Sequence, residues 1–262
     1  MSASNQQTRA IDILRATLRG VYLLVQLLLC IVLIISLRIS LGKNWFLTPT
    51  GLSIVHWWMR HFCRFLGLRI YQHGSPPAQT AFYVGNHISF LDILAVLSIT
   101  QLNFLSKDTV RYWPVIGYIS SAIGTIFIKR GKRSLVARAI DAVCEALKQG
   151  RSVMVFPEGT TAHEKEPRKF HAGLFQAAIN SKTPIQPVAI RYMRNGEPDR
   201  DAAYIDNDNL LITLYRVIKR PYTEVHVSFC TLLSPEGHDR TALANMARRQ
   251  IIDAFSQQLV AS

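Results

Sequence analysis

The N-terminal part of the chain contains a long hydrophobic stretch. Residues 20–37 carry no charged side chain, and Arg19 and Arg38 adjoin the two ends of this run. Its length is at the lower limit for a helix that spans a bilayer. A cleaved signal peptide is disfavoured, because Arg38 and Lys43 follow the run in place of a small-residue cleavage site. We therefore predict that the segment stays on the protein and either spans a membrane or enters one leaflet.

A second hydrophobic stretch, residues 51–68, has an amphipathic pattern. His56, Arg60 and Arg64 recur at four-residue spacing, which places them on one face of a helix. An apolar arc is formed by Val55, Trp58, Phe62 and Leu66. The arc can lie among acyl chains while the basic stripe faces lipid phosphates, or the helix can pack on the core of the protein. Tryptophan together with arginine favours the membrane interface, so we predict that both N-terminal helices enter the cytosolic leaflet as a pair.

The remainder of the chain alternates between short β-branched or aromatic runs and longer helical patterns. Strands are predicted over residues 81–85, 103–106, 125–129, 152–156, 185–191 and 224–229. Helices are predicted over residues 93–99, 134–149 and 241–259, where apolar side chains recur with helical spacing. This alternation predicts an α/β fold, with a mixed sheet flanked by helices. We expect membrane-associating helices in residues 1–69 and an α/β domain in residues 70–262.

Composition narrows the classes of partner. Hydrophobic residues make up 49% of the chain and charged residues 18%, which excludes an intrinsically disordered protein. The net charge of +13 indicates anionic partners such as lipid head groups, phosphates or nucleic acid. No nucleic-acid-binding module is recognisable, so we predict anionic membrane lipids as partners and no nucleic acid. The four cysteines lack the spacing of a disulfide framework or a zinc site, which indicates a reducing, cytosol-facing location without a metal.

Candidate catalytic groups follow the first predicted strand. His87 can accept a proton near neutral pH, and Asp92 can fix its tautomer and stabilise the imidazolium. On a continuous helix, residues five apart lie about 140° apart, so the pair needs a turn between the strand and the helix. The alternative is a loop histidine beside an aspartate that caps the helix.

Two later strands end in further candidate groups. Lys129 and Arg130 follow the strand that ends near residue 129, and an arginine fork suits phosphate or carboxylate oxygens. The next strand leads into Glu158, Gly159 and Thr160 after a proline. That carboxylate can hydrogen-bond an acceptor hydroxyl or hold Arg130, and the glycine lets the backbone approach a ligand. Solvated basic and polar turns are the alternatives.

Four blocks, taken in order, resemble the glycerolipid acyltransferase family, typified by 1-acylglycerol-3-phosphate acyltransferases. They are Asn86-His87-x-x-x-x-Asp92, Gly124-x-Ile126-Phe127-Ile128-x-Arg130, Phe156-Pro157-Glu158-Gly159-Thr160, and Pro187-Val188. The resemblance implies transfer of a fatty acyl chain from an acyl thioester, acyl carrier protein or coenzyme A, to the hydroxyl of a lysolipid. It implies 1-acylglycerol-3-phosphate as the acceptor and phosphatidic acid as the product, with no metal or bound cofactor. The expected location is a bacterial inner membrane, on its cytosolic face.

The resemblance also assigns roles to residues. His87 would deprotonate the acceptor hydroxyl and Asp92 would orient His87. Arg130 would bind the anionic group of the acceptor, and Glu158 with Gly159 would shape its site. The predicted substrate-binding set is Asn86, Ser89, Lys129, Arg130, Glu158, Gly159 and Thr160.

One position departs from the pattern of the family. Members that act on lysophosphatidate usually have an arginine where Thr161 stands, so Lys165, Arg168 or Lys169 would have to substitute, or the acceptor has another head group. Residues 203–206 and 214–218 resemble members that acylate lyso-ornithine lipid, which is the alternative acceptor. A serine hydrolase using Ser89 is disfavoured because there is no G-x-S-x-G motif. A non-catalytic protein that binds anionic lipid is the remaining alternative.

Overall fold

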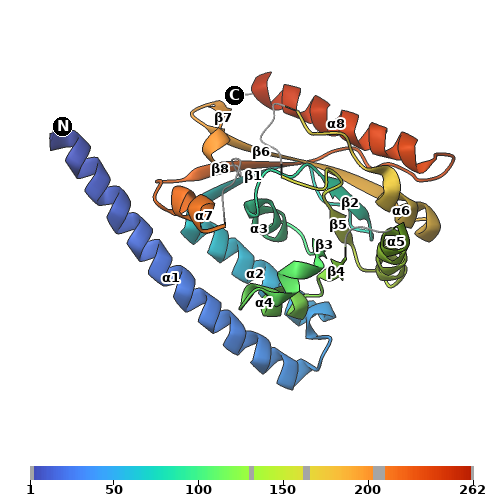
Figure 1. Cartoon of the computed structure of the whole chain (residues 1–262), viewed down its shortest axis with the longest axis horizontal. Coiled ribbons are helices and arrows are strands. Elements are labelled where there is room, and N and C mark those ends of the chain that lie inside the picture. Colours follow the sequence, from blue (N-terminus) through green and yellow to red (C-terminus); the bar gives the residue numbers. More distant parts are fainter. Residues whose placement is uncertain (1–2, 130–132, 162–165, 203–209, 261–262) are drawn as a thin grey trace.

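A mixed β-sheet forms the centre of the molecule in the computed structural model, which describes residues 3–129, 133–161, 166–202 and 210–260 (Figure 1). The sheet has eight strands, and β6 pairs antiparallel with β7 and β8 while the other pairings are parallel. In spatial order the strands are β1 (Leu68–His73), β8 (Thr223–Phe229), β6 (Ile185–Arg194), β2 (Phe82–Gly85), β5 (Val153–Val155), β3 (Asn103–Lys107) and β4 (Ile126–Ile128), with β7 (Glu197–Pro198) beside β6. The predicted α/β fold with a mixed sheet is confirmed.

Helices cover both faces of the sheet, and the alternation of side chains along β2 explains why. Phe82 and Val84 belong to one hydrophobic cluster and Tyr83 to the other, as expected for successive residues of a strand. The first face packs against α5 (Arg133–Lys148), α6 (Phe175–Ser181) and α8 (Arg240–Val260). The second packs against α2 (Pro49–Leu66), α3 (Leu91–Leu97) and α7 (Leu210–Ile218). Figure 1 shows α8 above the sheet, α5 and α6 at its right-hand end, and α2, α3 and α7 below it.

The longest helix, α1 (Ala3–Leu41), includes the predicted hydrophobic segment and extends beyond it at both ends. It is long and apolar enough to cross a membrane, judged by length and composition. One stripe of α1 packs on the protein, with Ala16 beside the main core and Ile34 and Leu37 in a smaller cluster. Arg19, which adjoins the apolar run, donates to the carbonyl of Ile218 at 3.0 Å and so holds the end of α7.

Helix α2 corrects one prediction. Leu66 is buried, and Phe62 and Val55 pack against buried clusters, so the apolar arc contacts the protein itself. The expectation that this arc lies among acyl chains is therefore wrong, and the alternative of packing on the core is correct. The pattern misled because α1 and the α/β body together cover this face. Trp57 lies outside the arc and is 58% exposed.

The connection between α2 and the sheet is shorter than the hydrophobic pattern predicts. The helix ends at Leu66 because Gly67 adopts a φ of 84°, a left-handed conformation that favours glycine. Leu68, predicted as the last residue of the helix, begins β1, which pairs with β8. Short elements that were not predicted include α4 (Ile116–Ala122) and the 3-10 helices η1 (Trp45–Leu47), η2 (Asp108–Tyr112), η3 (Ala172–Leu174) and η4 (Arg200–Ala202).

Candidate active site

The His87–Asp92 pair lies between the end of β2 and the first turn of α3. The Nδ1 of His87 and the Oδ2 of Asp92 are 2.8 Å apart. The turn that the spacing requires is present, because the backbone N–H of Asp92 donates to the carbonyl of Ser89 at 3.1 Å. The side chain of His87 is 21% exposed, whereas that of Asp92 is fully buried. A carboxylate oxygen accepts hydrogen bonds, so Nδ1 carries the proton and Nε2 is left with its lone pair.

Asp92 receives more hydrogen bonds than the sequence suggested. Its Oδ2 also accepts from the backbone N–H groups of Ile88 at 2.7 Å and Ser89 at 3.0 Å. Its Oδ1 accepts from the hydroxyl of Tyr192 at 2.7 Å. The helix-capping position of α3 belongs to Phe90, so Asp92 does not act as the cap. These four donors fix the carboxylate in one orientation toward His87.

Two aromatic residues complete the surroundings of the pair, and the sequence assigned neither of them a role there. Tyr192 comes from β6 and is buried, and burial together with the charge of Asp92 raises its pKa well above the usual value. The phenol therefore remains a hydrogen-bond donor. The ring of Phe156, at the end of β5, stacks on the imidazole of His87 with centroids 4.1 Å apart. Both rings restrict movement of the histidine–aspartate pair.

Replacement of Tyr192 by phenylalanine tests the role of its hydroxyl. We expect kcat to fall by about tenfold with little change in KM, because Asp92 loses one orienting bond but keeps its charge. The variant should also lose about 1–3 kcal/mol of stability, since Oδ1 is left buried without a donor. Steady-state acyl transfer and urea unfolding measure the two effects.

The same variant gives a pH test of the buried phenol. Its pKa is higher in the folded than in the unfolded chain, so the wild type loses this contribution to stability as pH rises above the ordinary tyrosine value of 10.0. The phenylalanine variant has no such proton to lose. The difference in unfolding free energy between the two proteins should therefore shrink as the pH rises above 10.0. A difference that stays constant would contradict the burial of an un-ionised phenol.

Glu158 joins the two loops that form the site. Its Oε1 accepts from the backbone N–H of His87 at 2.8 Å, and its Oε2 accepts from that of Arg168 at 2.9 Å. The carboxyl is buried, and burial raises its pKa against the lowering effect of these two bonds. Gly159 follows with a φ of 75°, and Thr160 is exposed. Both carboxyl oxygens are thus engaged by the backbone, which places the loop bearing His87 against the loop bearing Arg168.

Of the other residues predicted to bind substrate, Asn86 and Ser89 are buried and Lys129 is exposed. The carboxamide of Asn86 both donates to and accepts from the backbone of Ile190, each at 2.8 Å. Ser89 is fully buried, and its hydroxyl accepts from the N–H of Leu91 at 3.4 Å, which removes it as an exposed nucleophile. Lys129 is exposed just beyond β4.

The predicted anion-binding residue Arg130 lies outside the described residues, as does Lys165, one of the three cations that could substitute for the missing arginine. Arg168 and Lys169 are exposed on the loop that Glu158 holds, and Thr161 is half-buried. The described residues contain no cluster of three or more metal-ligating side chains of the His, Cys, Asp and Glu types.

The mixed sheet carries a partly exposed histidine with a buried aspartate behind it, an arrangement that suits an α/β enzyme with a general base. The fold matches the crystal structure of the 1-acyl-sn-glycerophosphate (LPA) acyltransferase PlsC from Thermotoga maritima, with a TM-score of 0.69 and 17% identity. The match covers 95% of this chain and 97% of that one.

Sequence comparisons define the family. The family model described as Acyltransferase matches residues 68–191. The lyso-ornithine lipid O-acyltransferase of Pseudomonas aeruginosa is 36% identical over 205 residues, covering 78% of this chain and 79% of the relative. The 1-acyl-sn-glycerol-3-phosphate acyltransferase of Neisseria meningitidis serogroup B is 31% identical over 188 residues, covering 71% and 73%. The chain belongs to the glycerolipid acyltransferase family and is an acyltransferase.

Proposed function

We propose that the protein transfers a fatty acyl chain from an acyl thioester to the free hydroxyl of a lysolipid, with His87 as the general base. The observation that carries the proposal is the 2.8 Å contact between Nδ1 of His87 and the buried carboxylate of Asp92. In the described part of the chain, Nδ1 is the ring nitrogen with a hydrogen-bond partner. Nε2 is therefore the atom that takes a proton from the acceptor.

The reaction follows from this arrangement. Nε2 of His87 removes the proton of the acceptor hydroxyl as its oxygen attacks the thioester carbonyl. The oxygen–carbon bond forms, the carbon–sulfur bond breaks, and the proton passes from the imidazolium to the leaving sulfur. Asp92 stabilises the imidazolium while the proton is held there. Because the thioester is already activated, no acyl-enzyme intermediate is needed, and we propose that the reaction uses neither a metal nor a bound cofactor.

For the acceptor, we propose 1-acylglycerol-3-phosphate, with lyso-ornithine lipid as a second candidate. The first is supported by the order of the four sequence blocks and by the Neisseria relative named for that reaction. The second is supported by Thr161 in place of an arginine and by the Pseudomonas relative. Purified protein offered each lysolipid separately, with acyl carrier protein and coenzyme A donors in parallel, distinguishes them. Fatty acid release without a donor would instead indicate a hydrolase.

Arg130 provides a further test of the acceptor site. If it binds the anionic group of the lysolipid, Arg130→Ala should raise KM for the acceptor by roughly ten- to a hundredfold, the cost of a charged hydrogen bond. The KM for the donor should stay constant. Arg138→Ala removes an exposed arginine of α5 and serves as the matched control. An unchanged KM for lysolipid in the Arg130 variant would contradict its anion-binding role.

We propose that α1 lies in one leaflet on the cytosolic side and does not span the bilayer. Its contacts with the rest of the protein extend from Ala16 to Leu37, about 32 Å at 1.5 Å per residue. That distance equals the thickness of the hydrocarbon core, so a spanning helix would draw the α/β body into the lipid. Protease mapping in sealed vesicles tests this orientation. An N-terminus and a catalytic domain found on opposite faces would contradict it.

A further inference from the structure

Helix α7 exposes an apolar surface that the acyl-transfer mechanism does not use. Leu211 is 69% exposed, Tyr215 is 51% exposed and Ile212 is 49% exposed. The opposite side of the same helix is buried through Val217 in the main core, and Leu214 beside it also packs there. A nine-residue helix that is apolar on both sides has one face in the protein and needs a second apolar environment for the other.

A second exposed cluster of aromatic residues lies in η2 and α4. Tyr112 is 74% exposed, and Trp113 and Tyr118 follow at 44% and 37%. Tyrosine and tryptophan are the residue types that concentrate where an apolar environment meets water. This cluster is far from α7 in the sequence.

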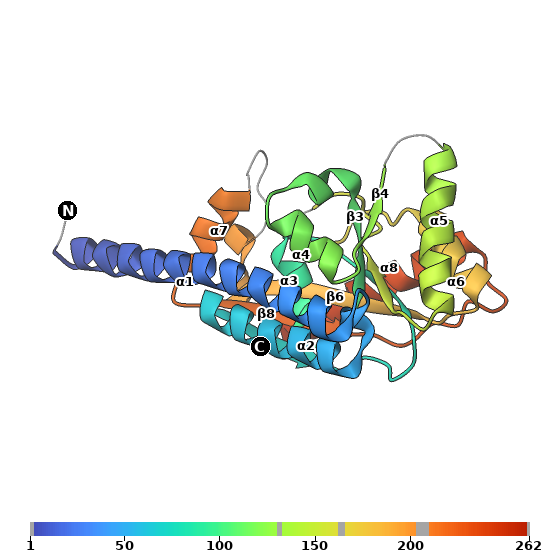
Figure 2. The same cartoon turned by 90° about the horizontal axis from the view of Figure 1, so that it is seen from below.

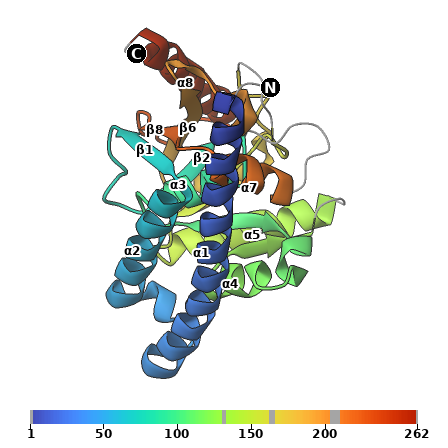
Figure 3. The ribbon, with the colours of Figure 1, turned by 90° about the vertical axis from the view of Figure 1, so that its left-hand side faces the viewer.

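Helix α1 connects the two surfaces. Arg15 and Arg19 of α1 donate to the carbonyls of Lys219 and Ile218 at the end of α7, at 2.8 and 3.0 Å. Ile119 and Ala122 of α4 pack in the same small cluster as Ile34 of α1. Figures 2 and 3 show α4 and α7 along one side of α1 and α2 along the other.

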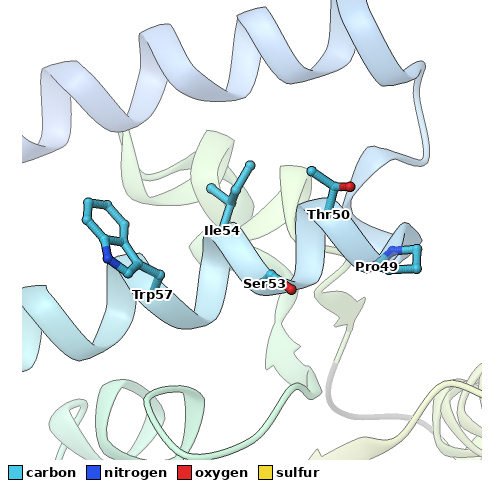
Figure 4. Close-up of a pocket in the computed structure, with 5 residues that line it drawn as sticks. All are labelled: Pro49, Thr50, Ser53, Ile54 and Trp57. Carbon is cyan, nitrogen blue, oxygen red and sulfur yellow. The ribbon is translucent and has the colours of Figure 1, made fainter.

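The outward face of α1 is apolar along its length, so the exposed surfaces of α4 and α7 extend it sideways. Its large exposed side chains include Leu14, Leu18, Leu24, Leu28, Val32 and Ile39. On the other side, α2 lines an open groove of about 540 Å³ with Pro49, Thr50, Ser53, Ile54 and Trp57 (Figure 4). The apolar surface is thus broader than the two N-terminal helices alone.

The charges beside the two clusters favour a bilayer as the partner. The Nζ of Lys219 lies 5.7 Å from the ring centroid of Tyr215, and the exposed Arg111 adjoins Tyr112. Cations next to tyrosine and tryptophan suit the level of the anionic lipid head groups. Both clusters adjoin α1, a helix that is long and apolar enough to cross a membrane. This position is expected for a surface that binds lipid, whereas a surface that binds a protein could lie anywhere on the molecule.

We infer that α7 and the η2–α4 segment contact the lipid bilayer together with α1, so that the protein rests on the membrane through a broad surface. The inference rests on the proposed membrane association of α1. Lipid contact at α7 also affects access to the active site, because α7 and α3 cover the same face of the sheet. Lipid contact at α7 brings the bilayer toward the face that carries the His87–Asp92 pair, and the acceptor reaches the site without leaving the membrane.

Charge placed on α7 tests the inference. We expect Leu211→Glu/Ile212→Glu in the full-length protein to lower partitioning onto vesicles of phosphatidylcholine and phosphatidylglycerol at least tenfold, measured by flotation. Tyr112→Glu/Trp113→Glu should act in the same direction. Val136→Glu on α5 and Met246→Glu on α8 are matched controls, because they alter exposed apolar residues on helices that cover the opposite face of the sheet. The controls should partition like the wild type, and all variants should acylate a micelle-free, short-chain lysolipid at the wild-type rate.

Three outcomes overturn the inference, and they are distinguishable. If the α7 variant partitions like its controls while Leu28→Glu/Val32→Glu on α1 lowers binding, α7 makes no lipid contact and the proposed membrane association stands. If vesicle binding stays constant but the α7 variant reduces self-association in light scattering, the surface binds a second copy. If the wild type does not bind vesicles, the proposed membrane association fails as well.

Discussion

Acyl transfer is expected to fall by about 10²–10⁴-fold when His87 is replaced by alanine, the range that general-base catalysis usually contributes. The variant removes Nε2, the atom that takes the proton of the acceptor hydroxyl. A lipid hydroxyl is un-ionised at neutral pH, so it needs a base to prepare it for attack on the thioester. Vesicle binding should not change, because His87 lies in the loop after β2 and not on the outward face of α1. Initial rates with labelled acyl thioester, together with flotation, measure both properties.

The control for this variant is another histidine of the same region. His171→Ala removes an exposed imidazole. The backbone N–H of His171, which the substitution keeps, donates to the carbonyl of Pro157. Its effect on turnover should be small. Retained turnover in the His87 variant would remove the assigned base, and an equal loss in both variants would indicate that the loops, and not the base, control the rate.

The fold was largely predictable where the pattern of the chain was strong. The strands β5 and β6 are short apolar runs, and the helices α5 and α8 have apolar residues at helical spacing. These patterns lie within each element, so they can be recognised without knowledge of the neighbouring elements. By contrast, β1 could not be predicted, because Leu68 continues the apolar run of α2. The chain changes direction at Gly67, whose left-handed conformation the hydrophobic pattern does not indicate. Helix α7 was missed because it is apolar on both its buried and its exposed sides, so it lacks the polar face by which a surface helix is recognised.

The site was predictable in the parts that are local in the sequence. His87 and Asp92 are five residues apart, and the turn between strand and helix sufficed to predict their contact. Tyr192 is 100 residues from Asp92 and meets it because β6 lies beside β2, a pairing that no local pattern contains. The motif predicts that Glu158 belongs to the site, but it does not predict which groups Glu158 contacts. Its partners are the backbone N–H groups of His87 and Arg168, and a backbone N–H is common to nearly every residue type.

The network around Asp92 allows its charge to be separated from its hydrogen bonds. In Asp92→Asn, the carboxamide oxygen can accept from His87, Ile88 and Ser89, and the amide group can donate to the hydroxyl of Tyr192. The contacts to His87, Ile88 and Ser89 are thereby kept, the hydroxyl of Tyr192 accepts where it donated before, and the negative charge is lost. In Asp92→Ala, all of these groups lose their partner in a buried position. The two variants therefore carry the same charge at this position but differ in stability.

We expect Asp92→Asn to lower kcat by about 10²–10⁴-fold, because a neutral partner does not stabilise the imidazolium that forms during the reaction. Its free energy of unfolding should stay within about 1 kcal/mol of the wild type, whereas Asp92→Ala should lose about 3 kcal/mol or more from several unpaired buried groups. Steady-state rates and urea unfolding of both variants provide the comparison. If Asp92→Asn kept near-wild-type turnover, Asp92 would be a scaffold for the loop, and stabilisation of the imidazolium would have to come from elsewhere. If it lost stability as fully as the alanine variant, the rate could not be attributed to charge.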